Sequence, residues 1–489
     1  MLFNSVEFIF FFILVTSLYF ILPHKFRWGL LLAASCYFYM AFVPIYILIL
    51  GFTIIIDFFA AIYIEKTNGQ RRKLLLAASI IANIGILCVF KYYNFFVDNI
   101  ESFSFIAFGN QLKLPYLSIL LPIGLSFHTF QALSYTIEVY RGHQVAERNL
   151  GIYSLYVMFY PQLVAGPIER PQNILHQFHE RKHFNYDNVT SGLRLMLWGM
   201  IKKVVIADRL SLFTDDVFNN IGNFPALTLV LAVFFFSFQI FCDFSGYSDI
   251  AIGAARVMGF KLMTNFNQPY QARNISEFWK RWHISLSTWF RDYLYIPLGG
   301  NRVKLYRGYL NLFIVFIISG FWHGANWTFI VWGALHGFYL IFAQVTKMPR
   351  NRIRNVLERF KLNFLNDLLD KIFVFILVAF AWIYFRANNL TDANTIVARI
   401  PDALKDIGQL LSDREVSFLK LPGDLPRTII GISLIIFLAF AHFVERRFRF
   451  SDVVASYPSY LRWLLYFIGV AAIVFIGVFQ KRTFIYFQF

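Results

Sequence analysis

The stretch Tyr309–Ala343, YLNLFIVFIISGFWHGANWTFIVWGALHGFYLIFA, decides the fold class because it contains no formal charge. A helix needs about 20 apolar residues to cross a bilayer. The stretch can therefore supply either two membrane passes or one pass and a re-entrant segment. A run of this kind predicts a membrane protein.

The composition of the whole chain agrees with that prediction. Of the 489 residues, 58% are hydrophobic, 20% are aromatic and only 15% are charged, against about 25% charged residues in a typical soluble domain. These values exclude a water-soluble enzyme and a disordered chain. The net charge of +17 comes from Lys and Arg at the ends of apolar runs, as the positive-inside rule expects, and we favour this explanation over nucleic-acid binding.

Other apolar runs predict the remaining membrane helices. They are Val6–Leu22, Trp28–Ile64, Leu74–Phe90, Pro115–Ile137, Leu150–Ile168, Phe224–Cys242, Ile372–Phe385, Thr428–Val444 and Trp463–Gln480. Trp28–Ile64 is long enough for two helices, broken near Pro44 or Gly51. We therefore expect one all-α polytopic domain over residues 1–489, with about 11–13 transmembrane or re-entrant helices.

The ends of these runs indicate an orientation. Lys25 and Arg27 follow the first run, which places the N-terminus outside, and Arg71-Arg72-Lys73 marks a cytoplasmic edge. Asn265–Arg307 mixes charges with Trp and Tyr, which predicts amphipathic helices at the membrane interface. Residues 386–427 are the longest polar segment and are expected to form an extramembrane excursion.

An ionisable residue inside a membrane span is costly, so it indicates function by default. His323 lies in Phe321-Trp322-His323-Gly324-Ala325-Asn326-Trp327, in the middle of the uncharged stretch. A neutral imidazole there could act as a general base, and a structural hydrogen bond between helices is the alternative. His336 is 13 positions further on; on a continuous helix the two rings would not share a site.

Three further clusters contain polar residues in apolar surroundings. Phe278–Gly300 has the composition of an interfacial helix, but that does not explain His283, Ser285 and Ser287 within it. In Phe241–Ile250, Asp249 could orient a histidine or neutralise a nearby arginine, and a structural ion pair is equally compatible. Arg256, seven positions further on, lies on the same helix face but too far along the axis for a standard pair. Tyr160–Pro171 is typical of a turn at the membrane surface. The three cysteines and the histidines show no metal-ligand spacing, which predicts no metal site.

Several of these motifs resemble the membrane-bound O-acyltransferase (MBOAT) family. The chain is similar to the bacterial branch with the membrane subunits of alginate O-acetylation and teichoic-acid D-alanylation. The matching motifs run in family order from about residue 120 to 340, and they are PIGLSFHTFQALSYTIEVYRG (122–142), YPQLVAGPIER (160–170), FCDFSGYSDIAIG (241–253), residues 279–300 and SGFWHGANW (319–327).

The resemblance implies a ring of helices around a central tunnel in the bacterial cytoplasmic membrane. The family's principal histidine corresponds to His323, and its upstream Trp-His or Trp-Asn position corresponds to His283. We expect the substrates to contact a set of neighbouring residues: Trp322, Asn326, Trp282, Ser285, Asp249 and Arg291. The expected donor is an acyl thioester from the cytoplasm, either acetyl-CoA or an acylated carrier protein, and no cofactor is expected.

The chain ends in TFIYFQF, residues 483–489. An aromatic belt at a membrane interface is one explanation. The tail also resembles that of the small membrane partner in D-alanylation systems, which implies that Tyr486 carries the acyl group to an extracytoplasmic SGNH-type transferase. Lys481 and Arg482 by themselves would instead place this end in the cytoplasm.

Two other classes of function remain as alternatives to an enzyme. A polytopic transporter of an anionic glycan or lipid would explain the number of spans, the basic edges and the intramembrane Asp57. A non-catalytic membrane scaffold would leave His323 and His283 replaceable. The family motifs favour the acyltransferase.

Overall fold

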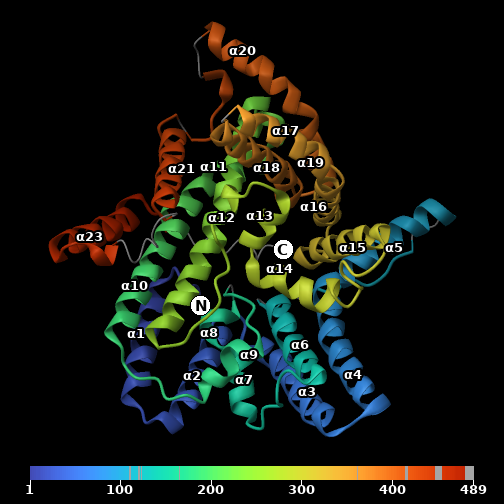
Figure 1. Cartoon of the computed structure of the whole chain (residues 1–489), viewed down its shortest axis with the longest axis vertical. Helices are drawn as coiled ribbons and strands as arrows, with labels where there is room; N and C mark the ends of the chain where they lie inside the picture. The colour runs from blue at the N-terminus through green and yellow to red at the C-terminus, as the bar shows by residue number, and fades with distance from the viewer. Residues whose placement is uncertain are drawn as a thin grey trace. The chain divides into compact units, whose positions relative to one another are not determined.

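The computed structural model describes residues 1–109, 112–118, 122, 124–164, 166–360, 362–413, 417–423, 425–445 and 454–479 (Figure 1). Within these ranges the chain is helical and has no β-strand. It divides into two compact units. The first unit comprises residues Met1–Met196 and Tyr247–Thr264, and the second comprises Leu197–Gly246 and Asn265–Phe489. The prediction of a single domain over 1–489 stays a prediction.

The first unit contains the N-terminal helices. They are α1 (Val6–Ile21), α2 (His24–Met40), α3 (Ile47–Lys66), α4 (Gly69–Leu87), α5 (Tyr93–Phe108), α6 (Leu125–Arg141), α7 (Leu150–Met158), α8 (Tyr160–Leu163), α9 (Pro171–Ile174) and part of α10 (Tyr186–Met200). Of the two predicted breaks in Trp28–Ile64, the one near Pro44 is confirmed, since Pro44 begins a short 3₁₀ turn before α3. Gly51 lies inside α3.

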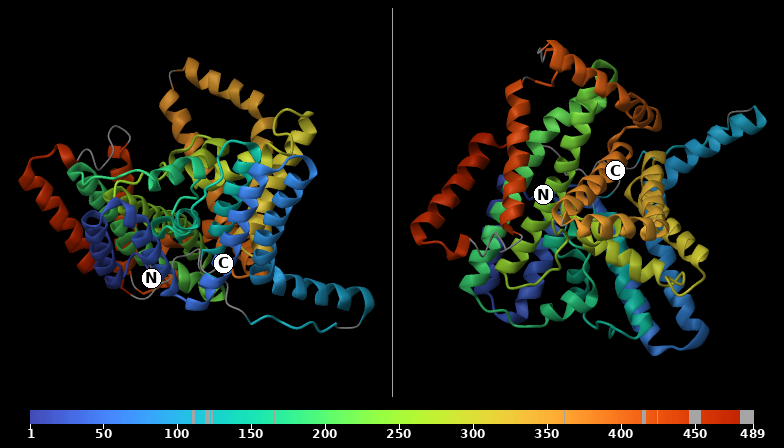
Figure 2. Two further views of the ribbon diagram at one scale, coloured as in Figure 1. Left: turned by 90° about the horizontal axis from the view of Figure 1, so that it is seen from below. Right: turned by 45° about the horizontal axis from the view of Figure 1, so that its top comes forward.

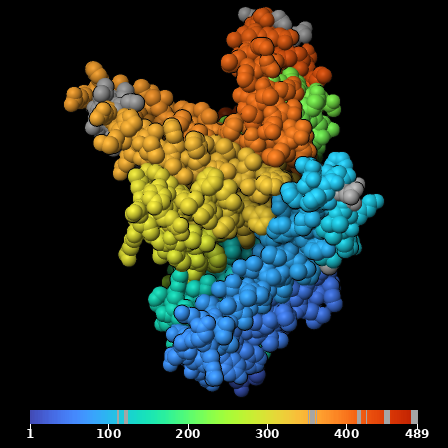
Figure 3. All heavy atoms as spheres, turned by 90° about the vertical axis from the view of Figure 1, so that its right-hand side faces the viewer, coloured from blue at the N-terminus to red at the C-terminus, as the bar shows by residue number. Residues whose placement is uncertain are grey.

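The helix α5 stands apart from the other helices of the first unit (Figure 2). It continues α4 through one π-helical turn, Cys88–Tyr92. Apolar side chains on both helices are exposed, including Ile81, Phe103 and Ile106, and Figure 3 shows the face that α4 and α5 present in blue to cyan. A lipid environment accounts for such apolar exposure, because lipid removes its cost.

Two predicted spans in the first unit begin or end elsewhere. In the described part of the run Pro115–Ile137 the helix α6 begins at Leu125. Gly124 before it has a left-handed φ of 77°, and a Cβ there would lie 2.8 Å from the carbonyl oxygen of Leu163. The run Leu150–Ile168 is also not one helix. α7 ends at Met158, before Pro161 interrupts the backbone ladder.

The second unit contains the remaining helices. They are α11 (Asp208–Asn219), α13 (Ile275–Arg281), α14 (Ile284–Phe290), α15 (Leu305–His323), α16 (Trp327–Val345), α17 (Lys347–Arg359), α18 (Asn363–Arg386), α19 (Leu390–Arg399), α20 (Ala403–Asp413), α21 (Leu425–Glu445) and α23 (Ser459–Ile476). The long helix α12 (Ala226–Val257) contributes residues to both units. It runs well beyond the predicted end at Cys242.

The uncharged stretch forms two antiparallel helices, α15 and α16 (Figure 1). Each helix is long and apolar enough to cross a membrane, and the choice between two passes and one pass with a re-entrant segment stays a prediction. Glycines let the helices approach closely: a Cβ on Gly320 would lie 2.2 Å from the carbonyl oxygen of Phe329, and one on Gly333 would lie 2.2 Å from that of Phe316. This contact fixes the register of the pair.

Within the described residues, eight helical segments are long and apolar enough to cross a membrane, and α1 is a shorter apolar helix. The all-α polytopic class is thus confirmed. Helices such as α7, α13 and α14 are too short to span a bilayer alone, in agreement with the expectation that some embedded helices do not cross.

Candidate active site

His323 is the last residue of α15 and is buried, with 4% of its surface exposed. Its ring lies among aromatic side chains of the second unit. The ring centroids of Trp322, Trp332 and Phe385 are 4.8, 5.0 and 5.3 Å from that of His323. The helix ends here because Gly324 is extended, and the side chain of Asn326 then caps α16 by accepting a hydrogen bond from the amide of Thr328.

His283 lies between two short helices, α13 and α14, where its backbone has a φ of 42°. The expectation of one interfacial helix over this segment is wrong, because the left-handed residue separates the two helices. The nearby Trp282 and Trp289 are also buried in the protein. A positive φ is rare for histidine and marks a position that its surroundings hold in a strained conformation.

The tautomer of His283 follows from its contact with Asn265. Oδ1 of Asn265 accepts hydrogen bonds from the amide and the hydroxyl of Ser285, at 3.3 and 2.9 Å, so it is the acceptor atom of that side chain. Nδ1 of His283 lies 3.1 Å from the same oxygen and must donate to it. The lone pair of the neutral ring is then on Nε2. Burial lowers the pKa of His283 to about 3, so the ring is neutral at physiological pH.

The indole of Trp322 contacts both of these histidines. Its ring centroid is 4.8 Å from that of His323 and 6.5 Å from that of His283. The second unit thus brings together three residues that the sequence proposed for one site, although 40 positions separate the histidines. Ser285 is also part of this group. It is fully buried, and its hydroxyl and the ring of His283 both donate hydrogen bonds to Oδ1 of Asn265.

His336 belongs to the same aromatic region, contrary to the estimate for a continuous helix. The chain turns between α15 and α16, so the two helices run back along each other. His323 and His336 consequently both contact Trp332, each with a centroid distance of 5.0 Å. Trp382 stacks on Trp332 at 5.9 Å.

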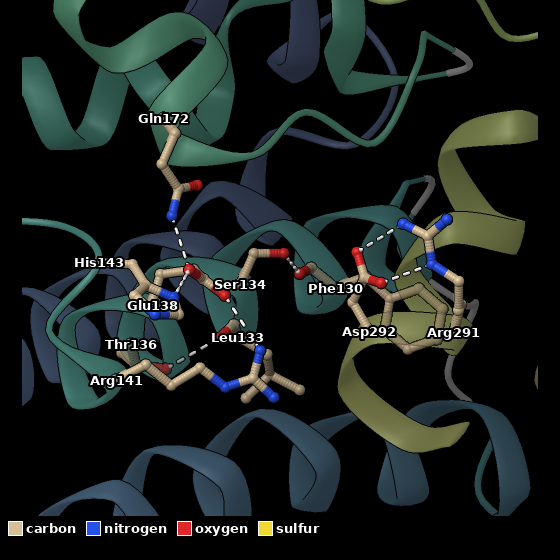
Figure 4. Close-up of polar contacts among 10 residues, drawn as sticks. All are labelled: Phe130, Leu133, Ser134, Thr136, Glu138, Arg141, His143, Gln172, Arg291 and Asp292. Carbon is tan, nitrogen blue, oxygen red and sulfur yellow. Dashed lines mark hydrogen bonds and ion pairs between the residues drawn. The ribbon is translucent and has the colours of Figure 1, made fainter. Parts of the chain in front are cut away.

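Three other predicted residues have contacts with residues other than the two histidines. Trp282 packs on Trp382 at 5.0 Å, and Asn326 donates a hydrogen bond to the carbonyl oxygen of Asn388. The guanidinium of Arg291 forms an ion pair with its neighbour Asp292 at 2.6 Å, as Figure 4 shows. A substrate role of Arg291 stays a prediction.

The acidic motif on α12 divides between the two units. Asp243, in the second unit, forms an ion pair at 2.7 Å with the buried Lys203, which also pairs with Asp208 at 2.8 Å. A structural ion pair therefore accounts for this acid. Asp249 is half-buried in the first unit together with Arg256, and its role with substrate stays a prediction.

Polar residues of the first unit stabilise its own loops. Glu138 accepts a hydrogen bond from Gln172 at 2.7 Å and pairs with Arg141 and His143 (Figure 4). Glu169, in the predicted turn after Tyr160, accepts one from the amide of Met263 at 2.5 Å. These contacts explain why the motifs around both residues are polar.

Two contacts place basic loops at the same end of the first unit. Arg72, in the basic triplet at the start of α4, donates to the carbonyl oxygen of Tyr140 at the end of α6. Arg148 pairs with Glu65 at the end of α3. The loops α3–α4 and α6–α7 therefore share one face, which the positive-inside rule assigns to the cytoplasm.

Sequence reasoning missed Asn265 and Trp332. Asn265 is 18 positions from His283, and only the folded backbone shows that it fixes the tautomer. Trp332 is one of many aromatic residues in an apolar run, so its position between two histidines had no distinctive signal. Tyr486 lies outside the described residues. Among the described residues no group of three or more His, Cys, Asp or Glu is arranged to hold a metal.

Comparison with known proteins places these residues in a family context. Residues 138–385 match the model of the membrane-bound O-acyltransferase family. The probable alginate O-acetylase AlgI of Pseudomonas aeruginosa is 39% identical over 400 residues, which cover 80% of this chain and 73% of that protein. The peptidoglycan O-acetyltransferase of Helicobacter pylori is 36% identical over 80% of this chain and 78% of its own. The teichoic acid D-alanyltransferase of Streptococcus thermophilus is 31% identical over 46% of this chain and 57% of its own.

Proposed function

This chain belongs to the membrane-bound O-acyltransferase family, and from that premise we propose that it moves an acetyl group from a cytoplasmic thioester for O-acylation of an extracytoplasmic polysaccharide. It is an O-acyltransferase and a multi-pass protein of the inner membrane. The polysaccharide is proposed because the relatives are named for alginate, peptidoglycan and teichoic acid.

The observation that carries the mechanism is the pair of buried imidazoles on the ring of Trp322. In the proposed reaction His323 takes the proton of the acceptor hydroxyl, and the hydroxyl oxygen attacks the thioester carbonyl. The C–S bond then breaks, and the leaving thiolate takes the proton from the imidazolium of His323. A base in an apolar site is neutral and ready to accept, because the surroundings disfavour the charged form.

The tautomer of His283 limits its part in this reaction. With Nδ1 donating to Asn265, the neutral ring can only accept at Nε2. It therefore cannot polarise a carbonyl by donating a hydrogen bond from that atom. The geometry is compatible with a role of His283 in positioning a substrate, through a hydrogen bond that a substrate N–H or O–H donates to Nε2.

We propose acetyl-CoA or an acylated carrier protein as the donor, and the basic cytoplasmic loops of the first unit support an anionic donor. The proposed acceptor is Tyr486, from which an extracytoplasmic SGNH-type partner would take the acetyl group. In that step His323 supplies the base that a phenol needs at neutral pH.

His323→Ala tests the assignment of the base. We expect acetylation of the exported polymer to fall at least about 100-fold, since general-base catalysis contributes roughly 10²–10⁴-fold. The measurement is ester-linked acetate per polymer, at matched protein abundance. His176→Ala is the control, because His176 is an exposed histidine of the first unit. Normal acetylation in the His323→Ala variant would refute the catalytic role.

Tyr486→Phe tests the acyl relay separately. The substitution removes the hydroxyl and keeps the aromatic ring, so we expect polymer acetylation to be lost while the protein remains in the membrane. Mass analysis of the C-terminal peptide after incubation with donor should show an acetyl adduct in the wild type alone. An active Tyr486→Phe variant would leave the tail as an anchor only.

The transporter alternative receives no support from Asp57. Its carboxylate accepts hydrogen bonds from Ser79 at 2.6 Å and from Asn83 at 2.9 Å within the first unit. These bonds from a neighbouring helix account for the buried acid as part of helix packing.

A further inference from the structure

The side chains of His336, Trp279 and Trp332 pack against one another in the second unit. His336 has ring centroids 4.9 Å from Trp279 and 5.0 Å from Trp332, and the two indoles are 5.8 Å apart. They come from α13 and α16 of the second unit. We call these three residues the His336 cluster.

The nitrogen atoms of this cluster are buried without hydrogen-bond partners among the described residues. This holds for Nδ1 and Nε2 of His336, for Nε1 of Trp279 and for Nε1 of Trp332. His336 and Trp332 have no exposed surface, and Trp279 is nine-tenths buried. Leaving a buried donor or acceptor unsatisfied costs free energy, and native proteins seldom retain several such groups together.

The third indole of this region provides a contrast. Trp382 stacks on Trp332 at 5.9 Å, and its Nε1 donates a hydrogen bond to the hydroxyl of Tyr270 at 3.3 Å. The indole N–H of Trp382 thus has a hydrogen-bond acceptor, whereas those of Trp279 and Trp332, both beside His336, have none among the described residues. Weak N–H to ring contacts are second-order interactions and do not replace a hydrogen bond.

We propose that the His336 cluster binds an amide group in the arm of the thioester donor, with the indoles of Trp279 and Trp332 donating to the amide carbonyl oxygen. This inference rests on the proposed function and deepens it. An indole N–H can only donate, whereas neutral imidazole has one donor and one acceptor. The cluster therefore offers an excess of donors and one acceptor, which fits an amide with its carbonyl oxygen and N–H.

The position of the cluster indicates how it acts. The ring centroid of Trp332 lies 5.0 Å from that of His336 and 5.0 Å from that of His323, so the cluster adjoins the proposed base through Trp332. A group bound there is part of the arm and not the reacting carbonyl. Its loss should weaken ground-state and transition-state binding equally, which raises KM and leaves kcat unchanged.

The test uses S-acetyl-pantetheine, which has the arm amides, and S-acetyl-2-mercaptoethanol, which has the thioester but no amide. We expect Trp279→Phe and His336→Phe to raise KM for S-acetyl-pantetheine about tenfold, equivalent to one hydrogen bond. KM for the amide-free donor should not change. Trp382→Phe is the matched control: it removes a satisfied indole N–H, so it should lower thermal stability without changing either KM.

The outcomes separate the inference from the function on which it rests. If the wild type transfers acetyl from no thioester, the proposed function fails. If it does transfer, and Trp279→Phe and His336→Phe leave both KM values unchanged or raise them equally, the inference alone is overturned. Because acetyl-CoA and an acetylated carrier protein present the same arm, its source is identified by which of the two donors the wild type uses.

Discussion

At the residue scale, the most specific feature is the single oxygen that orients His283. Oδ1 of Asn265 receives the ring Nδ1–H and both donors of Ser285. The backbone of His283 has a φ of 42°, a strained conformation that the surrounding contacts must stabilise. Asn265 is therefore a positioning residue, since it selects the tautomer that leaves the lone pair on Nε2.

Asn265→Ala should reduce the transfer rate by about tenfold, the equivalent of one lost hydrogen bond to a buried group. The ring could then adopt either tautomer. The measurement is the transfer rate with its pH profile, at matched abundance. Ser287→Ala is the control, because the hydroxyl of Ser287, on α14, donates to the carbonyl oxygen of Trp282. Equal rates in the two variants would contradict this role.

The two histidines could be identified from the sequence, whereas the residues that position them could not. His323 and His283 are polar residues in apolar or aromatic runs, and this contrast with their neighbours can be recognised in the sequence alone. The contacts of Asn265 with His283 and of Trp332 with His336 depend on where the backbone turns. No periodicity or composition encodes a left-handed residue at position 283.

At the element scale, the α15–α16 pair determines where His323, Trp332 and His336 lie. Gly320 and Gly333 oppose each other, and each leaves space only for a backbone. Apolar run lengths allowed two helices here, and of the two breaks expected in Trp28–Ile64 the one near Pro44 is confirmed. They failed for the start of α6, which follows the left-handed Gly124, and for the end of α12, which continues as one helix to Val257.

Gly333→Ala should destabilise the protein by about 1–3 kcal/mol, the usual cost of overpacking, because its Cβ would lie 2.2 Å from a backbone carbonyl. The rings on both helices would move with it, so transfer activity should also fall. Thermal unfolding in detergent and a transfer assay measure the two effects. Gly308→Ala is the control on α15, since its nearest neighbour would be at 3.8 Å; similar behaviour of the two variants would contradict the close contact.

At the scale of the whole molecule, the first unit is built from two distant parts of the chain, Met1–Met196 and Tyr247–Thr264. Glu169 joins them through the amide of Met263, and Gln177 does so through the amide and the carbonyl oxygen of Lys261. Glycines also allow close approach, since a Cβ on Gly192 would lie 2.7 Å from the carbonyl oxygen of Gly253. Such long-range pairings could not be predicted from local sequence.

The charge of Glu169 should make the stability of the whole protein depend on pH. Burial raises the pKa of this carboxyl from about 4.5 to about 7, although bonds from Met263 and Asn173 oppose the rise. Between those pH values the native protein holds a proton that the unfolded chain has released. The free energy of unfolding therefore falls as pH increases from 4.5 to 7, by roughly 3 kcal/mol at most.

Glu169→Gln is a neutral mimic of the protonated side chain, so it should remove this dependence. We expect its melting temperature in detergent to exceed that of the wild type at pH 8 and to approach it at pH 5. Glu180→Gln is the control, because Glu180 is a half-exposed surface carboxylate whose pKa is lowered by Lys182 and should not reproduce the gain at pH 8. A wild type as stable as Glu169→Gln at pH 8 would show that ionisation of the buried carboxyl does not destabilise the native protein, which would contradict the prediction.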